Sequence, residues 1–210
     1  MISKRLKGIA DLVPNGSFPI DVGTDHALVP IYLIKSNKCN KVIASDISNE
    51  CIIKSKNNVN KEKLNKKIKL YCTDGLNNIE DRYDTIIISG LGASTIIKIL
   101  KYNLNVKNII IQSNNNLNFI RNFMYKNNYK IDKELVIKEN GFYYDIIKYE
   151  KGKEKLKKRE LLFGKSGDRE YYNFLYNKYY NIYKSVPWNL KIHYLSYLFI
   201  LKKYYLKKTG

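Results

Sequence analysis

Short apolar runs alternate with amphipathic stretches along residues 1–127. The runs that predict strands cover residues 18–22, 41–45, 68–71, 83–89 and 108–112. The stretches around them have the apolar spacing of helices over residues 3–12, 27–36, 48–59, 93–102 and 117–127. The last two strand runs are nearly continuous in isoleucine, which is typical of parallel strands buried on both faces. The pattern therefore predicts a doubly wound α/β sheet.

The periodicity changes after this region. Residues 130–138 and 142–149 have the composition of strands, and they flank Asn140-Gly141, a dipeptide typical of a tight hairpin. We therefore expect the Rossmann-like sheet to end in an antiparallel strand. Because right-handed crossovers place the loops after parallel strands at one edge of the sheet, residues in those loops should lie close together.

The C-terminal part has helical periodicity. Its apolar positions recur at heptad spacing in two sets, Tyr172, Leu175, Tyr179, Ile182 and Val186, then Leu190, Tyr194, Tyr197, Leu201 and Tyr204. Pro187 separates the two sets. This spacing predicts an antiparallel, coiled-coil-like helical hairpin. We therefore expect one domain over residues 1–157 and a helical hairpin over residues 158–210.

The chain is strongly basic, with a formal net charge of +19. From residue 151 onward there are 15 Lys and Arg against 4 Asp and Glu. This uneven distribution favours a polyanionic partner such as RNA, and Lys157, Lys158 and Arg159 are candidate phosphate contacts. The alternative is a general lysine bias with a solvated basic face.

Tyrosines are also concentrated here, with ten between residues 171 and 205. Those at the heptad positions are expected in the core of the hairpin. The others, such as Tyr171, Tyr180, Tyr183 and Tyr205, are open to two interpretations, as packing residues or as RNA contacts.

Three cysteines, Cys39, Cys51 and Cys72, form no CxxC pair, so we expect reduced thiols and no metal site. The N-terminus lacks the apolar core of a signal peptide, and no stretch is long enough to cross a bilayer. We expect a cytoplasmic protein, monomeric and without a membrane partner.

The turn over Asp21–Ala27 follows the first predicted strand. Gly23 allows close backbone approach of a ligand, but the later positions of a GxGxxG fingerprint hold Asp25 and Ala27. An acid in this turn would repel a pyrophosphate and suits a cofactor with cationic groups, such as S-adenosylmethionine. Asp46, at the end of the second strand, can accept hydrogen bonds from a ribose diol. The alternative is an ordinary strand–helix turn.

Further candidate residues follow the other strands. The expected cofactor contacts are Asp21 (to the ammonium), Gly23, Thr24, Asp46, Ile47, Asp74 and Gly75 (near the adenine amine), and Ser89. The expected substrate contacts are Gly90, Leu91, Gly92, Gln112, Asn114 and Tyr143, together with the basic residues at 157–159. The glycines at 90 and 92 would give a thin backbone wall beside a nucleobase.

The loop after the fourth strand limits the chemistry. Methyltransferases that act on exocyclic amines of bases usually carry an Asn/Asp-Pro-Pro-aromatic sequence here, whereas this chain has Ser89–Gly92. A ring nitrogen, which has its own lone pair, is therefore the favoured acceptor. Asp25 and His26 are candidate acid/base or positioning groups. The alternative for His26 is a hydrogen bond that caps the following helix.

Several motifs together resemble the bacterial tRNA (adenine-22-N1)-methyltransferases. They are Ser3–Leu6, Pro14–Gly16, Asp21–Ala27 with Pro30, Asp74–Leu76, Ser89–Gly92 and Glu139–Gly141. The resemblance covers roughly residues 3–150. It implies a class I methyltransferase fold, S-adenosylmethionine as the methyl donor and N1 of adenine 22 in the tRNA D-arm as the acceptor. That adenine would be extruded toward Gly90–Gly92 and Asn114.

The chain departs from the family pattern at three positions. Ala93 stands where the family typically has glycine, Ser113 replaces a proline, and Asp46 replaces a residue that is often Glu. The first two changes affect the shape of the base pocket. Two other functions stay open: a small-molecule methyltransferase of the same fold, and a non-catalytic RNA-binding adaptor.

Overall fold

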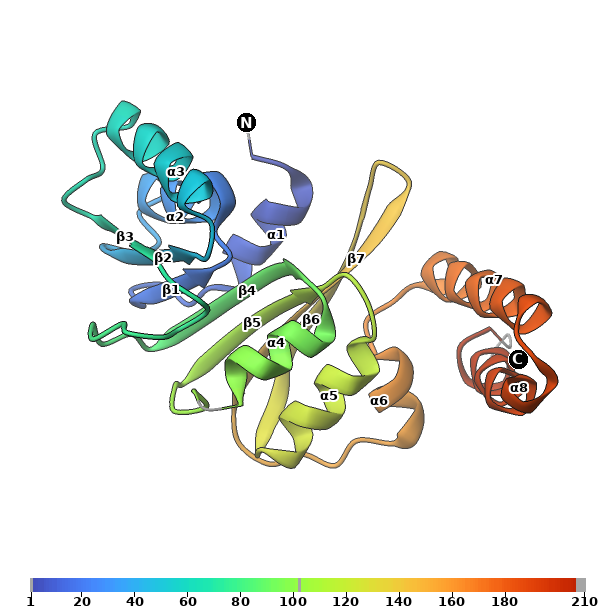
Figure 1. The fold of residues 1–210 in the computed structure, drawn as a ribbon. Coiled ribbons are helices and arrows are strands. Elements are labelled where there is room, and N and C mark those ends of the chain that lie inside the picture. Colours follow the sequence, from blue (N-terminus) through green and yellow to red (C-terminus); the bar gives the residue numbers. More distant parts are fainter. Residues whose placement is uncertain (1, 102, 207–210) are drawn as a thin grey trace.

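The computed structural model describes residues 2–101 and 103–206. Its centre is a seven-stranded sheet in the order β3-β2-β1-β4-β5-β7-β6 (Figure 1). The strands are β1 (Pro19–Val22), β2 (Val42–Asp46), β3 (Ile68–Cys72), β4 (Thr85–Leu91), β5 (Asn108–Ser113), β6 (Tyr129–Glu139) and β7 (Phe142–Lys151). The first five are parallel, and β7 pairs antiparallel with both β5 and β6. The predicted sheet and its antiparallel end are confirmed.

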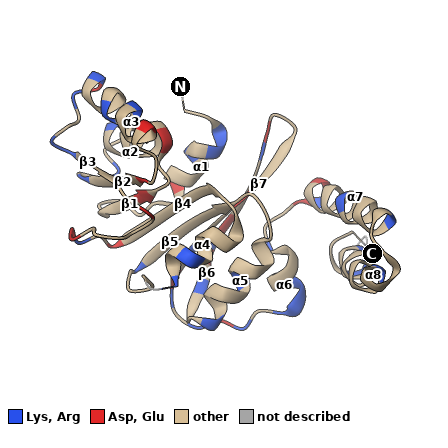
Figure 2. Cartoon of the chain, viewed as in Figure 1, with Lys and Arg blue, Asp and Glu red and all other residues tan. Residues whose placement is uncertain are grey.

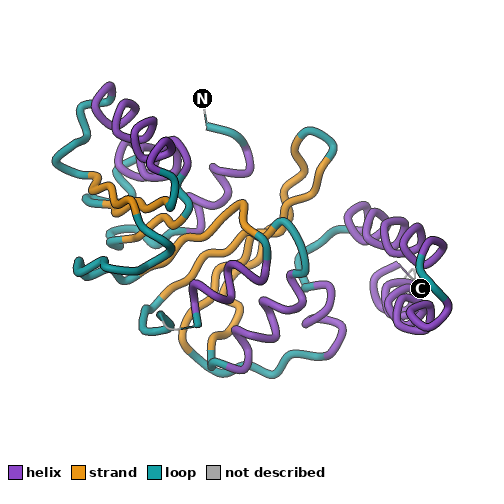
Figure 3. The backbone as a smooth tube through the Cα atoms, viewed as in Figure 1, coloured by secondary structure: helices purple, strands orange, loops and turns teal. Residues whose placement is uncertain are grey.

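Helices cover both faces of this sheet (Figure 3). The helices are α1 (Lys4–Leu12), α2 (Leu28–Lys35), α3 (Asn49–Lys61), α4 (Ala93–Leu100), α5 (Leu117–Lys126), α6 (Lys158–Phe163), α7 (Arg169–Ser185) and α8 (Trp188–Leu201). Residues of α1, α2 and α3 share one buried cluster with one face of the central strands, and residues of α4 and α5 share another. The isoleucine runs are buried because both faces of β4 and β5 are covered.

Local sequence signals set the starts of two helices. The Ser3 hydroxyl accepts a hydrogen bond from the Leu6 backbone N–H, and Ser48 accepts one from Cys51, each at 3.3 Å. These side chains satisfy N–H groups that a helix leaves unpaired at its first turn. Both capped helices begin within a residue of the predicted positions.

The prediction was wrong at two places. Strand β4 continues through Gly90 and Leu91, which were expected in a loop, because Leu91 pairs with Ser113 of β5. The short helix α6 was not predicted as a separate element. Helix α2 begins at Leu28, within a residue of the predicted start. The predicted end of the helix after β4, at Tyr102, lies outside the described residues.

The C-terminal helices α7 and α8 pack side by side at the β6–β7 end of the sheet (Figure 1). The heptad residues Tyr172, Leu175, Tyr197 and Leu201 are buried, which confirms the predicted hairpin. The prediction was wrong for Leu190 and Tyr204, which are exposed. Leu190 lies in the first turn of α8, and Tyr204 lies where the chain continues from Lys202 to Leu206 as a π-helical turn that changes the helical register. The boundary between residues 157 and 158 stays a prediction.

For two of the off-seam tyrosines, the structure supports the interpretation as packing residues. Tyr171 is buried and donates to the Asp145 carboxylate, and Tyr205 stacks on Tyr172 with 4.1 Å between ring centroids. Tyr205 also donates to the Gly164 carbonyl at 2.9 Å. Tyr180 stays exposed and Tyr183 is half-buried.

Basic side chains are spread over the outer helices, including α3 and α6 as well as α7 (Figure 2). The positive surface is therefore wider than the C-terminal hairpin alone. Within the described part of the chain, no helix combines the length and apolar character needed to cross a bilayer.

Candidate active site

A cavity of about 440 Å³ lies at the carboxyl ends of β1, β2 and β4. Nine predicted site residues line it: Asp21, Gly23, Thr24, Asp25, Asp46, Ser89, Gly90, Leu91 and Asn114. Arg5, Leu6, Leu28 and Val29 complete the lining. The topology thus brings together turns that are far apart in the sequence, as expected for a parallel sheet whose order reverses between β1 and β4.

Asp21 is the buried acid of this cavity. The Thr24 hydroxyl donates to its carboxylate at 2.7 Å. Burial raises the pKa of Asp21 to about 6, the Thr24 hydrogen bond opposes this, and the nearby Asp46 adds to it. A buried carboxylate with only a neutral partner is well suited to accept a cationic group from a ligand.

Gly23 and Asp46 shape the adjoining part of the cavity. The backbone N–H groups of Gly23 and Thr24 both donate to the Ser45 carbonyl, at 2.8 and 3.0 Å. Gly23 has a φ of +72°, which a residue with a side chain rarely adopts. The Asp46 carboxylate accepts hydrogen bonds from the backbone of Ser48 and, at 3.5 Å, of Asp25. Asp46 is therefore held at the tip of β2, where a diol can be bound.

The turn that follows has an unusual backbone. Asp25, His26 and Ala27 have φ values of +21°, +57° and +55°. Such conformations are uncommon for residues with a Cβ, and they are concentrated at functional sites. The Asn58 side chain supports the turn by donating to the His26 carbonyl at 2.9 Å. This left-handed turn lies directly before the first residue of α2, Leu28.

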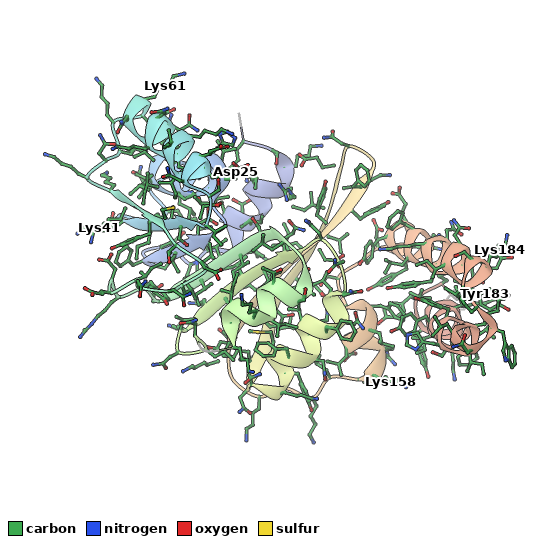
Figure 4. All side chains as sticks on the ribbon, in the orientation of Figure 1. Asp25, Lys41, Lys61, Lys158, Tyr183 and Lys184 are labelled. Atoms are coloured by element: carbon green, nitrogen blue, oxygen red, sulfur yellow. The ribbon has the colours of Figure 1, made fainter. Side chains whose placement is uncertain are left out.

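Asp25 and His26 differ in their position relative to the cavity. Asp25 lines the cavity, and Figure 4 shows it beside α3 and α1. His26 is not among the lining residues, and its Nε2 atom lies 3.4 Å from the Asp25 carboxylate. Helix α2 has no side-chain cap, so the alternative of a capping role for His26 is not supported. The geometry favours Asp25 as the group that meets a ligand and His26 as its neighbour.

The Gln112 side chain forms hydrogen bonds to the part of the cavity wall that contains Gly90 and Asn114. Its side-chain oxygen accepts from Arg5 at 2.9 Å and from the Gly90 N–H at 3.2 Å, and its amide donates to Asn114 at 3.3 Å. Gln112 is buried and does not line the cavity, and it contacts Gly90 and Asn114, which do. Arg5 was not predicted, although it lies in the Ser3–Leu6 motif, because nothing local indicates a contact 107 residues away.

Three predicted cofactor residues and one predicted substrate residue, Gly92, are not among the residues that line the cavity. Asp74 and Gly75 line a separate depression of about 210 Å³, where Lys98 Nζ is 3.7 Å from the Asp74 carboxylate. Ile47 is 70 % exposed at the end of β2. Gly92 precedes α4, and the Ala93 N–H next to it donates to the Asn115 side chain at 3.0 Å.

The remaining predicted substrate contacts lie outside the cavity. Tyr143, on β7, lines a neighbouring groove that also reaches Asn114. Lys157 and Lys158 are exposed, and the Arg159 guanidinium lies over the Tyr204 ring at 4.7 Å. Figure 4 shows Lys158 far from Asp25, so this basic segment can reach only a large substrate. Its role stays a prediction.

A family model described as "Methyltransferase domain" matches residues 2–147. The chain belongs to this methyltransferase family. It is 35 % identical over 156 residues to the tRNA (adenine(22)-N(1))-methyltransferase of Bacillus subtilis, a match that covers 72 % of this chain and 66 % of that protein. It is 33 % identical over 171 residues to a putative tRNA methyltransferase of Mycoplasma genitalium, covering 78 % and 77 %.

Solved structures of methyltransferases agree with this assignment. TrmK of M. capricolum in complex with S-adenosyl-homocysteine has a TM-score of 0.88 and 29 % identity, and the match covers 97 % of both chains. A putative tRNA (m1A22) methyltransferase of Streptococcus pneumoniae in complex with S-adenosyl-L-methionine has a TM-score of 0.86 and 27 % identity, covering 97 % and 99 %. The expected fold class and family are confirmed, and the C-terminal hairpin is included in the match.

Proposed function

We propose that this methyltransferase transfers a methyl group from S-adenosylmethionine to N1 of adenine 22 in tRNA. The observation that carries the proposal is the cavity that joins the Asp21 carboxylate to the glycine-containing wall at Gly90, in a chain that is similar to a tRNA (adenine(22)-N(1))-methyltransferase. The buried acid suits a cationic cofactor, and the open wall suits a nucleobase.

The residues of the cavity fit S-adenosylmethionine. Asp21 would accept a hydrogen bond from the α-ammonium, the Gly23 turn would lie against the amino-acid part, and Asp46 would bind the ribose diol. Asp25 in the turn disfavours a phosphate-bearing nucleotide. When bound, the cofactor supplies an electrophilic methyl group on a sulfonium centre.

The chain's own residues would act mainly by alignment. N1 of adenine has a lone pair, so no base is needed to remove a proton before attack. Gly90 and Asn114 would position the base, and Gln112 and Arg5 hold that wall in place. N1-methyladenosine carries a positive charge, which the Asp25 carboxylate at the cavity is placed to stabilise.

The polyanionic partner in this proposal is tRNA, approached at its D-arm. The basic surfaces of α6, α7 and α8 would hold the body of the tRNA through its phosphates. Because adenine N1 is hidden in paired or stacked RNA, the target base would leave its stack to enter the cavity. A monomeric, cytoplasmic enzyme is part of the same proposal.

The test is methylation of an unmodified tRNA transcript, followed by nucleoside mass spectrometry. We expect N1-methyladenosine in the wild-type transcript and none in a transcript with guanosine at position 22. N6-methyladenosine would contradict the proposed chemistry. Absence of any methylated nucleoside from tRNA would favour the small-molecule alternative.

A further inference from the structure

A second groove continues from the active-site cavity between α5, β7 and α7. It has a volume of about 100 Å³, and Asn114 lines both it and the cavity. The other residues that matter here are Asn116, Tyr143, Phe174 and Lys178. The groove therefore begins at the loop where the substrate base is proposed to enter and leads toward α7.

The floor of the groove is a buried charge network. The Arg121 guanidinium contacts Glu134 at 2.5 Å and Asp145 at 3.6 Å, and the side chains of Arg121 and Glu134 are each 2 % exposed. Tyr171 donates to the Asp145 carboxylate at 2.7 Å. These four residues come from α5, β6, β7 and α7. A hydrogen-bonded network of this kind, satisfied by partners on every wall, fixes the walls relative to one another.

The walls carry aromatic and cationic groups. The rings of Tyr143 and Phe174 lie 4.8 Å apart, and Phe174 is 37 % exposed. Lys178 follows Phe174 by one helical turn, so the two side chains share a face of α7, and Lys178 is exposed. The salt bridges of the described residues do not include Lys178. On the loop side, the amides of Asn114 and Asn116 are exposed.

We propose that this groove binds the RNA nucleotide next to the target adenine, with its base against Phe174 and Tyr143 and its phosphate near Lys178. The inference rests on the proposed tRNA substrate. An exposed aromatic face with a neighbouring cation is the combination by which proteins hold unpaired nucleotides without reading sequence. The amides of the loop supply donors and acceptors for the base edge.

Extruding one base leaves its neighbour without a stacking partner. A preformed aromatic surface one nucleotide away from the cavity would replace that lost stacking and so lower the cost of extrusion. The rigid floor keeps this surface in place before RNA binds. Helix α7 would then bind a base by stacking, in addition to contacting phosphates.

The test compares Phe174→Leu with Tyr125→Leu, a control at a residue on α5 that is 41 % exposed and outside the groove. Leucine keeps apolar packing and removes the flat ring. We expect Phe174→Leu to weaken tRNA binding about tenfold, with unchanged S-adenosylmethionine affinity and melting temperature. Phe174→Trp should restore tRNA binding. Equal tRNA affinities of the two leucine variants would overturn the proposal.

A second comparison uses Lys178→Gln and Lys61→Gln. Lys61 lies on α3, at the opposite end of the molecule from α7 (Figure 4). Loss of one phosphate contact should reduce the slope of log Kd against log salt by about one for Lys178→Gln and leave it unchanged for Lys61→Gln. An unchanged slope for Lys178→Gln would overturn the phosphate contact.

A fluorescence measurement locates the nucleotide directly. Methyl-acceptor tRNA with 2-aminopurine beside position 22 should show quenching by the wild-type protein and less quenching by Phe174→Leu. Equal quenching would contradict stacking in the groove. Methylation and quenching are separate readouts: equal quenching with adenine 22 still methylated overturns the groove proposal alone, and an unmethylated adenine 22 overturns the proposed function on which it rests.

Discussion

Asp21 illustrates how a single residue combines a cost in stability with a function. Its carboxylate is buried beside a hydroxyl, and burial raises its pKa to about 6. Because the folded-state pKa is above the usual value of 3.8, this group stabilises the fold most at low pH, and that stability is lost as the pH rises through about 6. A bound cation would offset this cost at neutral pH.

The Asp21→Asn variant should therefore be more stable than the wild type without ligand. We expect a gain of about 3 kcal/mol in the free energy of unfolding at pH 7 and a much smaller gain near pH 4, measured by urea denaturation at both values. The same variant should bind S-adenosylmethionine at least tenfold more weakly, measured by calorimetry. A stability difference that is the same at both pH values would contradict the assignment.

The two polar residues of the left-handed turn should respond differently to substitution. Asp25 lines the cavity, whereas His26 lies behind it, so Asp25→Ala should lower kcat for tRNA methylation about tenfold or more. His26→Ala should have a smaller effect on kcat, because His26 contacts Asp25 at 3.4 Å and does not line the cavity. The measurement is steady-state methyl transfer at saturating cofactor. An unchanged kcat for Asp25→Ala would exclude it from the chemistry.

At the scale of the elements, one buried network joins the catalytic sheet to α7. Arg121 on α5 neutralises part of the charge of Glu134 and Asp145, and Tyr171 completes the cluster from α7. Gly164, between α6 and α7, fits against this cluster, where a Cβ would come within 2.6 Å of Glu134 Oε1. The C-terminal hairpin is therefore packed onto the sheet by specific contacts.

Removing the cation from this network should be costly. Arg121→Met leaves two buried carboxyl groups without their partner, so we expect a loss of about 3–5 kcal/mol in unfolding free energy. The control is Lys35→Met, which breaks the exposed Lys35–Glu62 pair and should cost less than about 1 kcal/mol. Urea denaturation measures both. Similar losses for the two variants would mean that the buried network adds little.

At the scale of the whole molecule, positive and negative side chains occupy different places. Basic side chains lie on most outer helices, while the cavity itself contains the acids Asp21, Asp25 and Asp46. In the proposed function, this separation would let the outer surface attract RNA while the acidic cavity favours a cationic cofactor and a cationic methylated base. Because α6 and α7 pack on the sheet, deleting the hairpin would disturb the fold as well as RNA binding.

Charge neutralisation tests the hairpin without deleting it. Lys184, Lys191 and Lys202, replaced together by Gln, should reduce the slope of log Kd for tRNA against log salt by about 2–3 if each contacts a phosphate. The matched control replaces Lys54, Lys56 and Lys61 on α3. The measurement is filter binding over a range of salt concentrations. Equal slopes for both triple variants would show that the charge acts only as a general surface property.

Much of the fold follows from local sequence. Three local signals each specify structure within a few residues. They are the isoleucine runs of β4 and β5, the serines that cap α1 and α3, and Asn140-Gly141 in the turn between β6 and β7. Most of the residues that line the cavity were predictable for the same reason, since the carboxyl ends of parallel strands meet at one edge of the sheet. These features depend on periodicity and turn chemistry, which a sequence displays directly.

Tertiary structure decided which side chains meet. Arg5 reaches Gln112 across 107 positions, Tyr171 turns inward to Asp145, and His26 lies behind Asp25 in a turn whose backbone no sequence pattern predicted. The sequence by itself determined the sheet, the position of the turn after β1 and the basic helical hairpin, because each is encoded by near neighbours. The base wall and the groove required the folded chain, because their contacts join residues that only packing brings together.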